Sequence, residues 1–156
     1  MSLARHAIQT LLATFTIGII LIVEDAFSGG SVSRGILIAA LGSTGFVLFI
    51  TPHAEVAQPR HSLGSHAIAI AAGTLFGVIG HTYSGIPIGI AAAVAVGVTM
   101  FIMALTDTSH APAAGTALGM SVQEFHWDLI VMFLLGILAL VFMHHLFKGK
   151  LKNLVQ

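Results

Sequence analysis

The sequence predicts an all-α fold, a polytopic bundle of transmembrane helices with five spans (four are possible) and a short re-entrant half-helix. Of the 156 residues, 56% are hydrophobic and only 8% are charged, whereas a soluble domain carries about 25% charged residues. Uncharged apolar runs also recur near the length, roughly 20 residues, that crosses a hydrocarbon core of about 30 Å. We therefore expect one integral membrane domain over residues 1–156.

Five uncharged runs are the candidate spans, and they cover residues 7–23, 35–50, 67–80, 86–105 and 129–147. The run 67–80 is short and is interrupted by glycine. Pro59 suits the first position of a helix, where its missing N–H costs nothing, so this span is expected to begin near Pro59. Ser121 and Glu124 fit a capping box, which predicts that the last helix begins near Val122.

The segment from Pro112 to Met120 is apolar and rich in small residues, but it has only nine residues. As a helix it would be about 14 Å long and could not cross alone, so we expect a re-entrant half-helix. A helix N-terminus carries partial positive charge and free N–H groups, which suit an anion. A surface loop with a short helix is the alternative interpretation.

Two segments rich in proline, histidine and small residues, 51–66 and 106–120, each follow an even-numbered span and precede an odd-numbered one. They are therefore expected on the same membrane face. Basic residues mark the cytoplasmic side, and three of the six lie in the tail after residue 147. Five crossings then place the tail in the cytoplasm and both segments on the opposite face.

These segments supply the candidate anion-binding residues. A guanidinium stays charged and offers several donors to an oxyanion, and histidine can donate to an anion or carry a proton. Arg60 could equally well contact lipid head groups instead of an anion. The histidines could equally well be packed side chains without a role in transport. The candidates are Arg60, His66, Ser109, His110, Gly115 and Thr116.

Composition also excludes several classes of function. Six basic residues balance six acidic ones, so the chain lacks the basic excess that binds nucleic acid. No pair among nine histidines has the spacing of a helical zinc motif with a glutamate, so we expect no metal, and no cofactor is implied. All six acidic residues lie at span ends, which argues against an enzyme buried in the membrane.

Small residues recur at intervals of four in two places, at Gly73 and Gly77 and again at Gly89, Ala93 and Gly97. Such spacing allows helix backbones to approach closely in lipid. The contact could form inside one bundle or between two copies. Because five short helices rarely enclose a pathway unaided, we expect a homo-oligomer.

Two motifs of the sequence, one following the other, resemble those of the HPP family of small integral membrane proteins. The first is Gly42-Ser-Thr-Gly, followed by Pro52, Ala57-Gln-Pro-Arg60, Leu63-Gly64 and His66. The second is His110-Ala-Pro-Ala-Ala-Gly-Thr-Ala-Leu118, in which Ala111 replaces the second residue of the family's His-Pro-Pro. The resemblance runs from about residue 35 to residue 146.

The resemblance implies a bundle of four or five helices and suggests nitrite transport. The expected function is thus a transporter or channel for a small inorganic anion, with nitrite as the first candidate, in contact with membrane lipid in a bacterial inner (plasma) membrane. Ala111 leaves the substrate choice open. The alternatives are a non-transporting structural or accessory subunit and a membrane-embedded enzyme.

Overall fold

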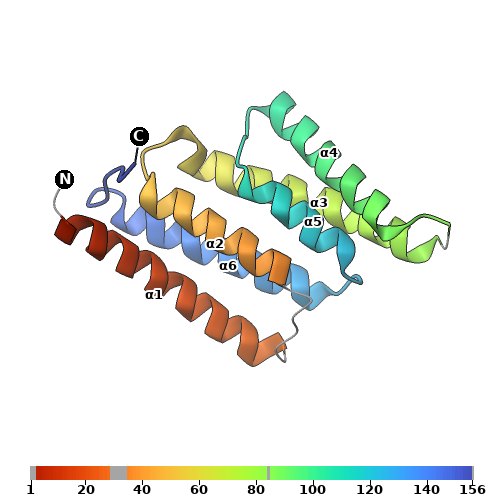
Figure 1. The fold of residues 1–156 in the computed structure, drawn as a ribbon, viewed down its shortest axis with the longest axis horizontal. Helices are drawn as coiled ribbons and strands as arrows, with labels where there is room; N and C mark the ends of the chain where they lie inside the picture. The colour runs from red at the N-terminus through yellow and green to blue at the C-terminus, as the bar shows by residue number, and fades with distance from the viewer. Residues whose placement is uncertain (1–2, 29–34, 84, 156) are drawn as a thin grey trace.

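The computed structural model describes residues 3–28, 35–83 and 85–155, and these residues form a bundle of helices (Figure 1). The described part contains no strand. Four helices are long and apolar enough to cross a membrane, and a shorter apolar helix, α2, lies among them. In chain order the elements are α1 (Leu3–Ser28), α2 (Gly35–Ile50), η2 (Glu55–Ala57), α3 (Pro59–Thr82), α4 (Ile88–Thr106), α5 (Pro112–Val122) and α6 (Trp127–Phe147).

The helix bounds confirm most of the predicted spans. Helix α2 has the predicted ends, and α3 begins at Pro59, which occupies the first helical turn. The prediction that a capping box starts the last helix near Val122 is wrong. The Ser121 hydroxyl donates back to the Leu118 carbonyl at the end of α5, Gln123 is extended, and the last helix begins at Trp127.

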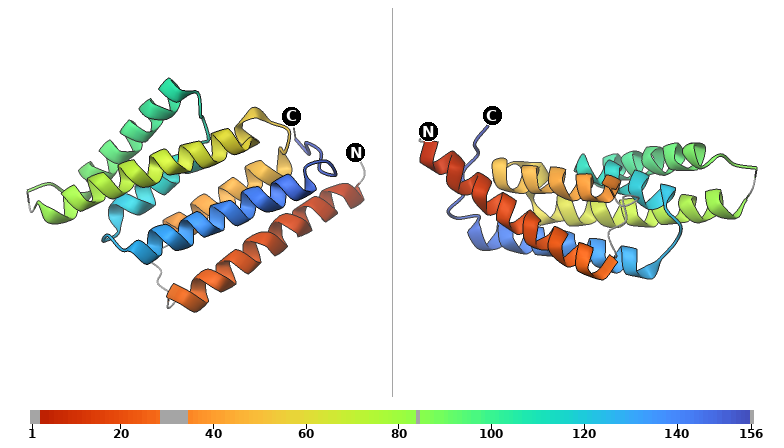
Figure 2. Two further views of the ribbon diagram at one scale, coloured as in Figure 1. Left: turned by 180° about the vertical axis from the view of Figure 1, so that it is seen from behind. Right: turned by 60° about the horizontal axis from the view of Figure 1, so that its bottom comes forward.

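The two chain ends lie at the same end of the bundle (Figures 1 and 2). Hydrogen bonds tie the C-terminal tail to the segment after α2: His53 N–H donates to Asn153 Oδ1 at 3.0 Å, and Leu154 N–H donates to the Ile50 carbonyl at 2.8 Å. Gln9 in α1 donates to the Phe49 carbonyl. The prediction that the tail and the proline-containing segments lie on opposite faces is therefore wrong.

The course of α5 explains this result. The half-helix is present over Pro112–Val122, and it runs alongside α3 in the same direction (Figure 2). Its start lies near His66 and its end lies near Gly77. From there the chain enters α6 at the far end of the bundle instead of returning. The short helix and its flanking residues thus make a sixth passage, and an even number of passages brings both ends of the chain together.

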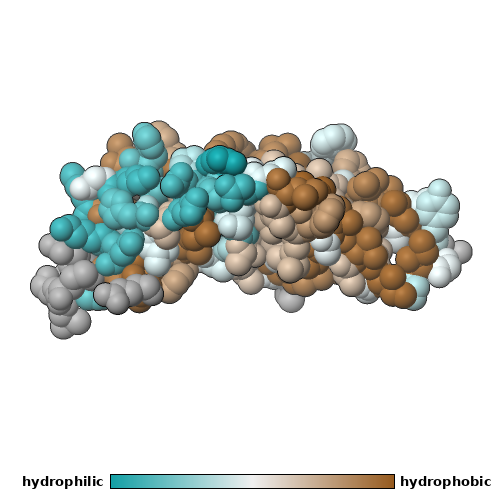
Figure 3. All heavy atoms as spheres, turned by 90° about the horizontal axis from the view of Figure 1, so that it is seen from above, coloured by the Kyte–Doolittle hydropathy of each residue, from teal (hydrophilic) through white to brown (hydrophobic). Residues whose placement is uncertain are grey.

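Hydrophilic side chains gather at the end that holds the chain termini, and apolar side chains cover most of the remaining surface in Figure 3. We call this the polar end, and define it by residues 51–60, 106–110 and 148–153. Along the helices, large apolar side chains such as Phe15, Phe101 and Phe142 are exposed, each by 64% or more. Such a surface fits contact with lipid acyl chains.

Two small-residue patterns have different roles. A Cβ atom on Gly73 would lie 2.6 Å from the Ala117 carbonyl oxygen, and one on Gly77 would lie 3.0 Å from Ser121. These glycines therefore allow α3 and α5 to pack closely within one chain. Gly89 and Gly97, on α4, have open space beside them. The expected homo-oligomer stays a prediction.

Candidate functional site

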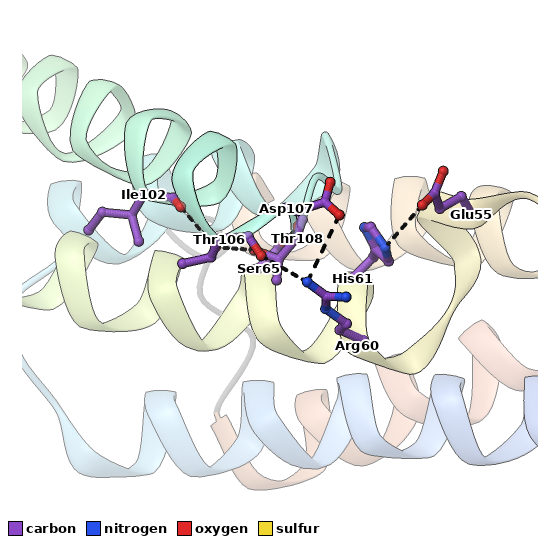
Figure 4. Close-up of polar contacts among 8 residues, drawn as sticks. All are labelled: Glu55, Arg60, His61, Ser65, Ile102, Thr106, Asp107 and Thr108. Atoms are coloured by element: carbon purple, nitrogen blue, oxygen red, sulfur yellow. Dashed lines mark hydrogen bonds and ion pairs between the residues drawn. The ribbon is translucent and has the colours of Figure 1, made fainter.

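The polar end holds a surface group of charged residues at the start of α3 (Figure 4). Arg60 Nη2 donates to the Thr106 carbonyl at 3.1 Å and lies 3.9 Å from Asp107 Oδ2. Both side chains are well exposed, by 64% and 78%, so solvent weakens their attraction. Buried His61 has its Nε2 atom 3.9 Å from the exposed carboxylate of Glu55.

The loop between α4 and α5 descends into the bundle from this surface. It turns at Asp107, whose φ of 51° is the left-handed conformation that ends α4. The Ser65 hydroxyl of α3 then donates to the Thr108 carbonyl. A side chain at Gly64 would just touch Thr108, at 3.4 Å. Backbone below the surface needs such partners, because lipid supplies none.

Below the loop, four buried polar side chains converge from three helices and the loop. His66 of α3 lies between two threonines: its Nε2 is 2.9 Å from Thr44 Oγ1 of α2, and its Nδ1 is 2.9 Å from Thr116 Oγ1 of α5. His110 Nε2 is 3.4 Å from the same Thr44 oxygen. All four side chains are at most 1% exposed. We call Thr44, His66, His110 and Thr116 the buried cluster.

Two further contacts fix the imidazole rings. His110 Nδ1 lies 2.8 Å from the Val56 carbonyl, and because a carbonyl only accepts, this nitrogen carries a hydrogen. The ring of His66 packs edge-on against Phe133 of α6 and against His110, with centroids 5.8 Å and 5.2 Å away.

The start of α5 has fewer free backbone donors than the sequence suggested. Pro112 has no N–H, Ala113 N–H donates to the His110 carbonyl, and Ala114 N–H donates to the Ala111 carbonyl. These donors are already bonded in the structure. Any anion near this helix would therefore rely on side chains more than on backbone N–H groups.

A largely apolar groove of about 590 Å³ lies between α2 and the start of α5. Its lining includes Ala40, Ser43, Pro112 and Gly115. Ala40 connects the groove to the buried cluster, because its carbonyl accepts the Thr44 hydroxyl at 2.8 Å. A Cβ atom on Gly115 would meet only Ala40 Cβ, at 3.5 Å, so the glycine leaves this part of the groove open.

The structure brings together only part of the predicted site. His66, His110 and Thr116 belong to the buried cluster, Gly115 lines the groove beside it, and Arg60 and Ser109 are exposed at the polar end. Sequence reasoning missed Thr44 as a site residue, although it lies inside the Gly42-Ser-Thr-Gly motif. Within the described ranges, no three metal-ligating side chains lie together.

The sequence matches the family described as HPP, transmembrane region, over residues 1–153. The chain therefore belongs to this family of membrane proteins. It is also 27% identical over 109 residues to a transmembrane protein of Dictyostelium discoideum, covering 70% of this chain and 38% of that protein. The chain thus spans less than half of that relative. No solved structure matches.

Proposed function

We propose that this protein carries a small inorganic anion across the membrane, with nitrite as the first candidate. The observation that supports the proposal is the buried cluster, in which Thr44, His66, His110 and Thr116 converge inside an otherwise apolar bundle. Polar side chains at depth are costly in a membrane protein and tend to mark a transport pathway. A purely structural subunit would have no need of the polar side chains of His66 and Thr116, whose ring nitrogen and hydroxyl bond to each other.

The surroundings of the cluster suggest a route for the anion. Arg60 and Ser109 lie exposed at the polar end, where Ser109 directly precedes His110 in the loop before α5 and Arg60 bonds to the Thr106 carbonyl that leads into this loop. An exposed guanidinium attracts anions and offers them several donors. The groove beside Gly115 then gives space for a small ion next to the cluster. In this proposal Arg60 attracts the anion, and the histidine and threonine side chains accompany its passage.

The basic residues suggest how the bundle is oriented. Four of the six lie at the polar end, namely Arg60, Lys148, Lys150 and Lys152. Arg5 belongs to the first turn of α1, which begins at the same end of the bundle (Figure 1), and Arg34 lies outside the described residues. Because basic residues are retained on the cytoplasmic side, we propose that the polar end is cytoplasmic, in a bacterial inner membrane. In this orientation the C-terminal tail is cytoplasmic, as the sequence predicted, and Arg60 is cytoplasmic as well, whereas the sequence predicted it on the opposite face.

The test is nitrite uptake by liposomes that contain the purified protein. Gly115→Leu should abolish uptake, because the side chain would fill the groove at a position where the structure has room for it. Gly97→Leu adds the same side chain to the open surface of α4 and should transport normally. Uptake no faster than in protein-free liposomes would overturn the proposal and favour an accessory subunit.

A further inference from the structure

The hydrogen bonds of the buried cluster can be assigned from their acceptors. The carbonyl oxygens of Val56 and Ala40 only accept, so His110 Nδ1–H donates to the first, at 2.8 Å. The Thr44 hydroxyl has one hydrogen for two acceptors, the Ala40 oxygen at 2.8 Å and His110 Nε2 at 3.4 Å, and the shorter contact takes it. Thr44 Oγ1 is then an acceptor toward both histidines.

The rest of the cluster follows from this assignment. His66 Nε2–H donates to Thr44 Oγ1, which leaves Nδ1 as the acceptor of the Thr116 hydroxyl. Each contact now has a hydrogen except one: His110 Nε2 and Thr44 Oγ1 face each other with lone pairs. Five contacts are present, but two neutral imidazoles and two hydroxyls supply only four hydrogens. A single added proton, on His110 Nε2, would complete the set.

We propose that the buried cluster is a binding site for one proton, held on His110 Nε2 and donated to Thr44 Oγ1. The Thr44 oxygen, which both imidazoles contact, then accepts a hydrogen from each ring while its own hydrogen stays on the Ala40 carbonyl. This inference extends the proposed function: the proton is the ion that accompanies the anion. The role of the proton in transport therefore rests on the proposed function.

The surroundings offer the proton a way in from the polar end. Glu55 is exposed, and its carboxylate lies 3.9 Å from Nε2 of buried His61. The other ring nitrogen of His61, Nδ1, is buried and has no hydrogen-bond partner among the described residues. In this proposal a proton taken up at Glu55 passes to His61, which lies on α3 five residues before His66 of the cluster.

The charged groups around His110 favour a site for one proton and not two. His61 and His66, both on α3, face it as further titratable groups, and a second positive charge beside the first would be repelled. Arg60 and Asp107 lie at the exposed surface above, where they partly offset each other. The elements α2 and α5 contribute only the neutral hydroxyls of Thr44 and Thr116.

The experiment is a pH titration of the purified full-length protein with ¹⁵N-labelled histidine, followed by NMR. The signals of His66 and His110 should change together in one transition that takes up one proton. Thr44→Val removes the acceptor of the proton, and losing a hydrogen bond to a charged group should move the midpoint down by about one to two pH units. Thr44→Ser keeps the hydroxyl and should titrate like the wild type.

Thr99→Val is the matched control, because Thr99 is also fully buried but, among the described residues, its hydroxyl bonds only to the Ala95 carbonyl within α4. It should leave the transition unchanged. Two independent transitions for His66 and His110, or a Thr44→Val midpoint equal to that of the wild type, would overturn the proposal. The wild-type titration counts the protons even if Thr44→Val does not fold.

Nitrite uptake under an imposed pH gradient separates this proposal from the previous one. Uptake that accelerates with the gradient in the wild type and loses this response in Thr44→Val supports coupling. Uptake with no response to the gradient would leave the anion proposal intact and overturn the coupling. The coupled titration without any nitrite uptake would leave the proton site standing and overturn the anion proposal.

Discussion

Gly73→Ala should destabilise the protein by forcing α5 away from α3. The new Cβ would lie 2.6 Å from the Ala117 carbonyl oxygen and 2.7 Å from Met120 Cβ, where 3.4 Å is an ordinary contact. To restore normal van der Waals separation, α5 must retreat by about 0.8 Å. Thr116 is the neighbour of Ala117, so its 2.9 Å contact with His66 would lengthen to about 3.7 Å, which is no longer a hydrogen bond.

The expected loss of stability in Gly73→Ala combines three free-energy terms. Overpacking costs about 1 to 3 kcal/mol, and the lost hydrogen bond costs about 1 kcal/mol. Alanine recovers up to about 1 kcal/mol through its higher helix propensity. The free energy of unfolding of Gly73→Ala, measured by SDS titration of the protein in detergent micelles, should therefore fall by about 1 to 3 kcal/mol.

Gly97→Ala is the matched control, because no described residue lies within 4 Å of its added Cβ. It gains the same helix propensity without a clash and should be as stable as the wild type or slightly more stable. If Gly73→Ala were no less stable than Gly97→Ala, the close approach of α3 and α5 would not exist as described. The role assigned to Thr116 would then fail with it.

Two further predictions concern the polar end. Single cysteines at Ser109 and Lys152 should react with an impermeant reagent from the same side of the membrane and a cysteine at Tyr83 from the other; opposite labelling of Ser109 and Lys152 would contradict the six-passage topology. Arg60→Gln should slow nitrite uptake about tenfold or more, in line with losing a charged hydrogen bond, whereas Lys152→Gln removes an equal charge at the same end and should change uptake little; equal effects would reduce Arg60 to a head-group contact.

The sequence predicted the helices well because their signals are local. The ends of α2 follow from the apolar run between Gly35 and Ile50, and the start of α3 follows from the backbone of Pro59. The capping box failed because Ser121 has another local partner, the Leu118 carbonyl. A serine three residues before a glutamate is compatible with the end of one helix as well as the start of the next.

The same local reasoning could not predict the topology. Counting apolar residues correctly shows that α5 is too short to cross alone, but it cannot show that the extended residues on either side complete the passage. That depends on partners from elsewhere in the chain, such as Ser65 for the Thr108 carbonyl. The buried cluster was unpredictable for a similar reason, since His66 meets residues 22 and 50 positions away.

Not every polar residue near the cluster argues equally for function. The loop before α5 lies below the surface, and its backbone and that of the neighbouring loop need partners there. Ser65 and His110 each bond to a carbonyl of these loops, and Arg60 bonds to the carbonyl of Thr106 at the end of α4, so the demands of the fold alone explain their polarity. The contacts of His66 and Thr116 do not include such a carbonyl: His66 bonds through both ring nitrogens to threonine hydroxyls. A leucine and a valine of similar volume would pack at these two positions without any polar cost. The polarity of His66 and Thr116 therefore carries the strongest argument that the centre of this bundle binds or moves an ion.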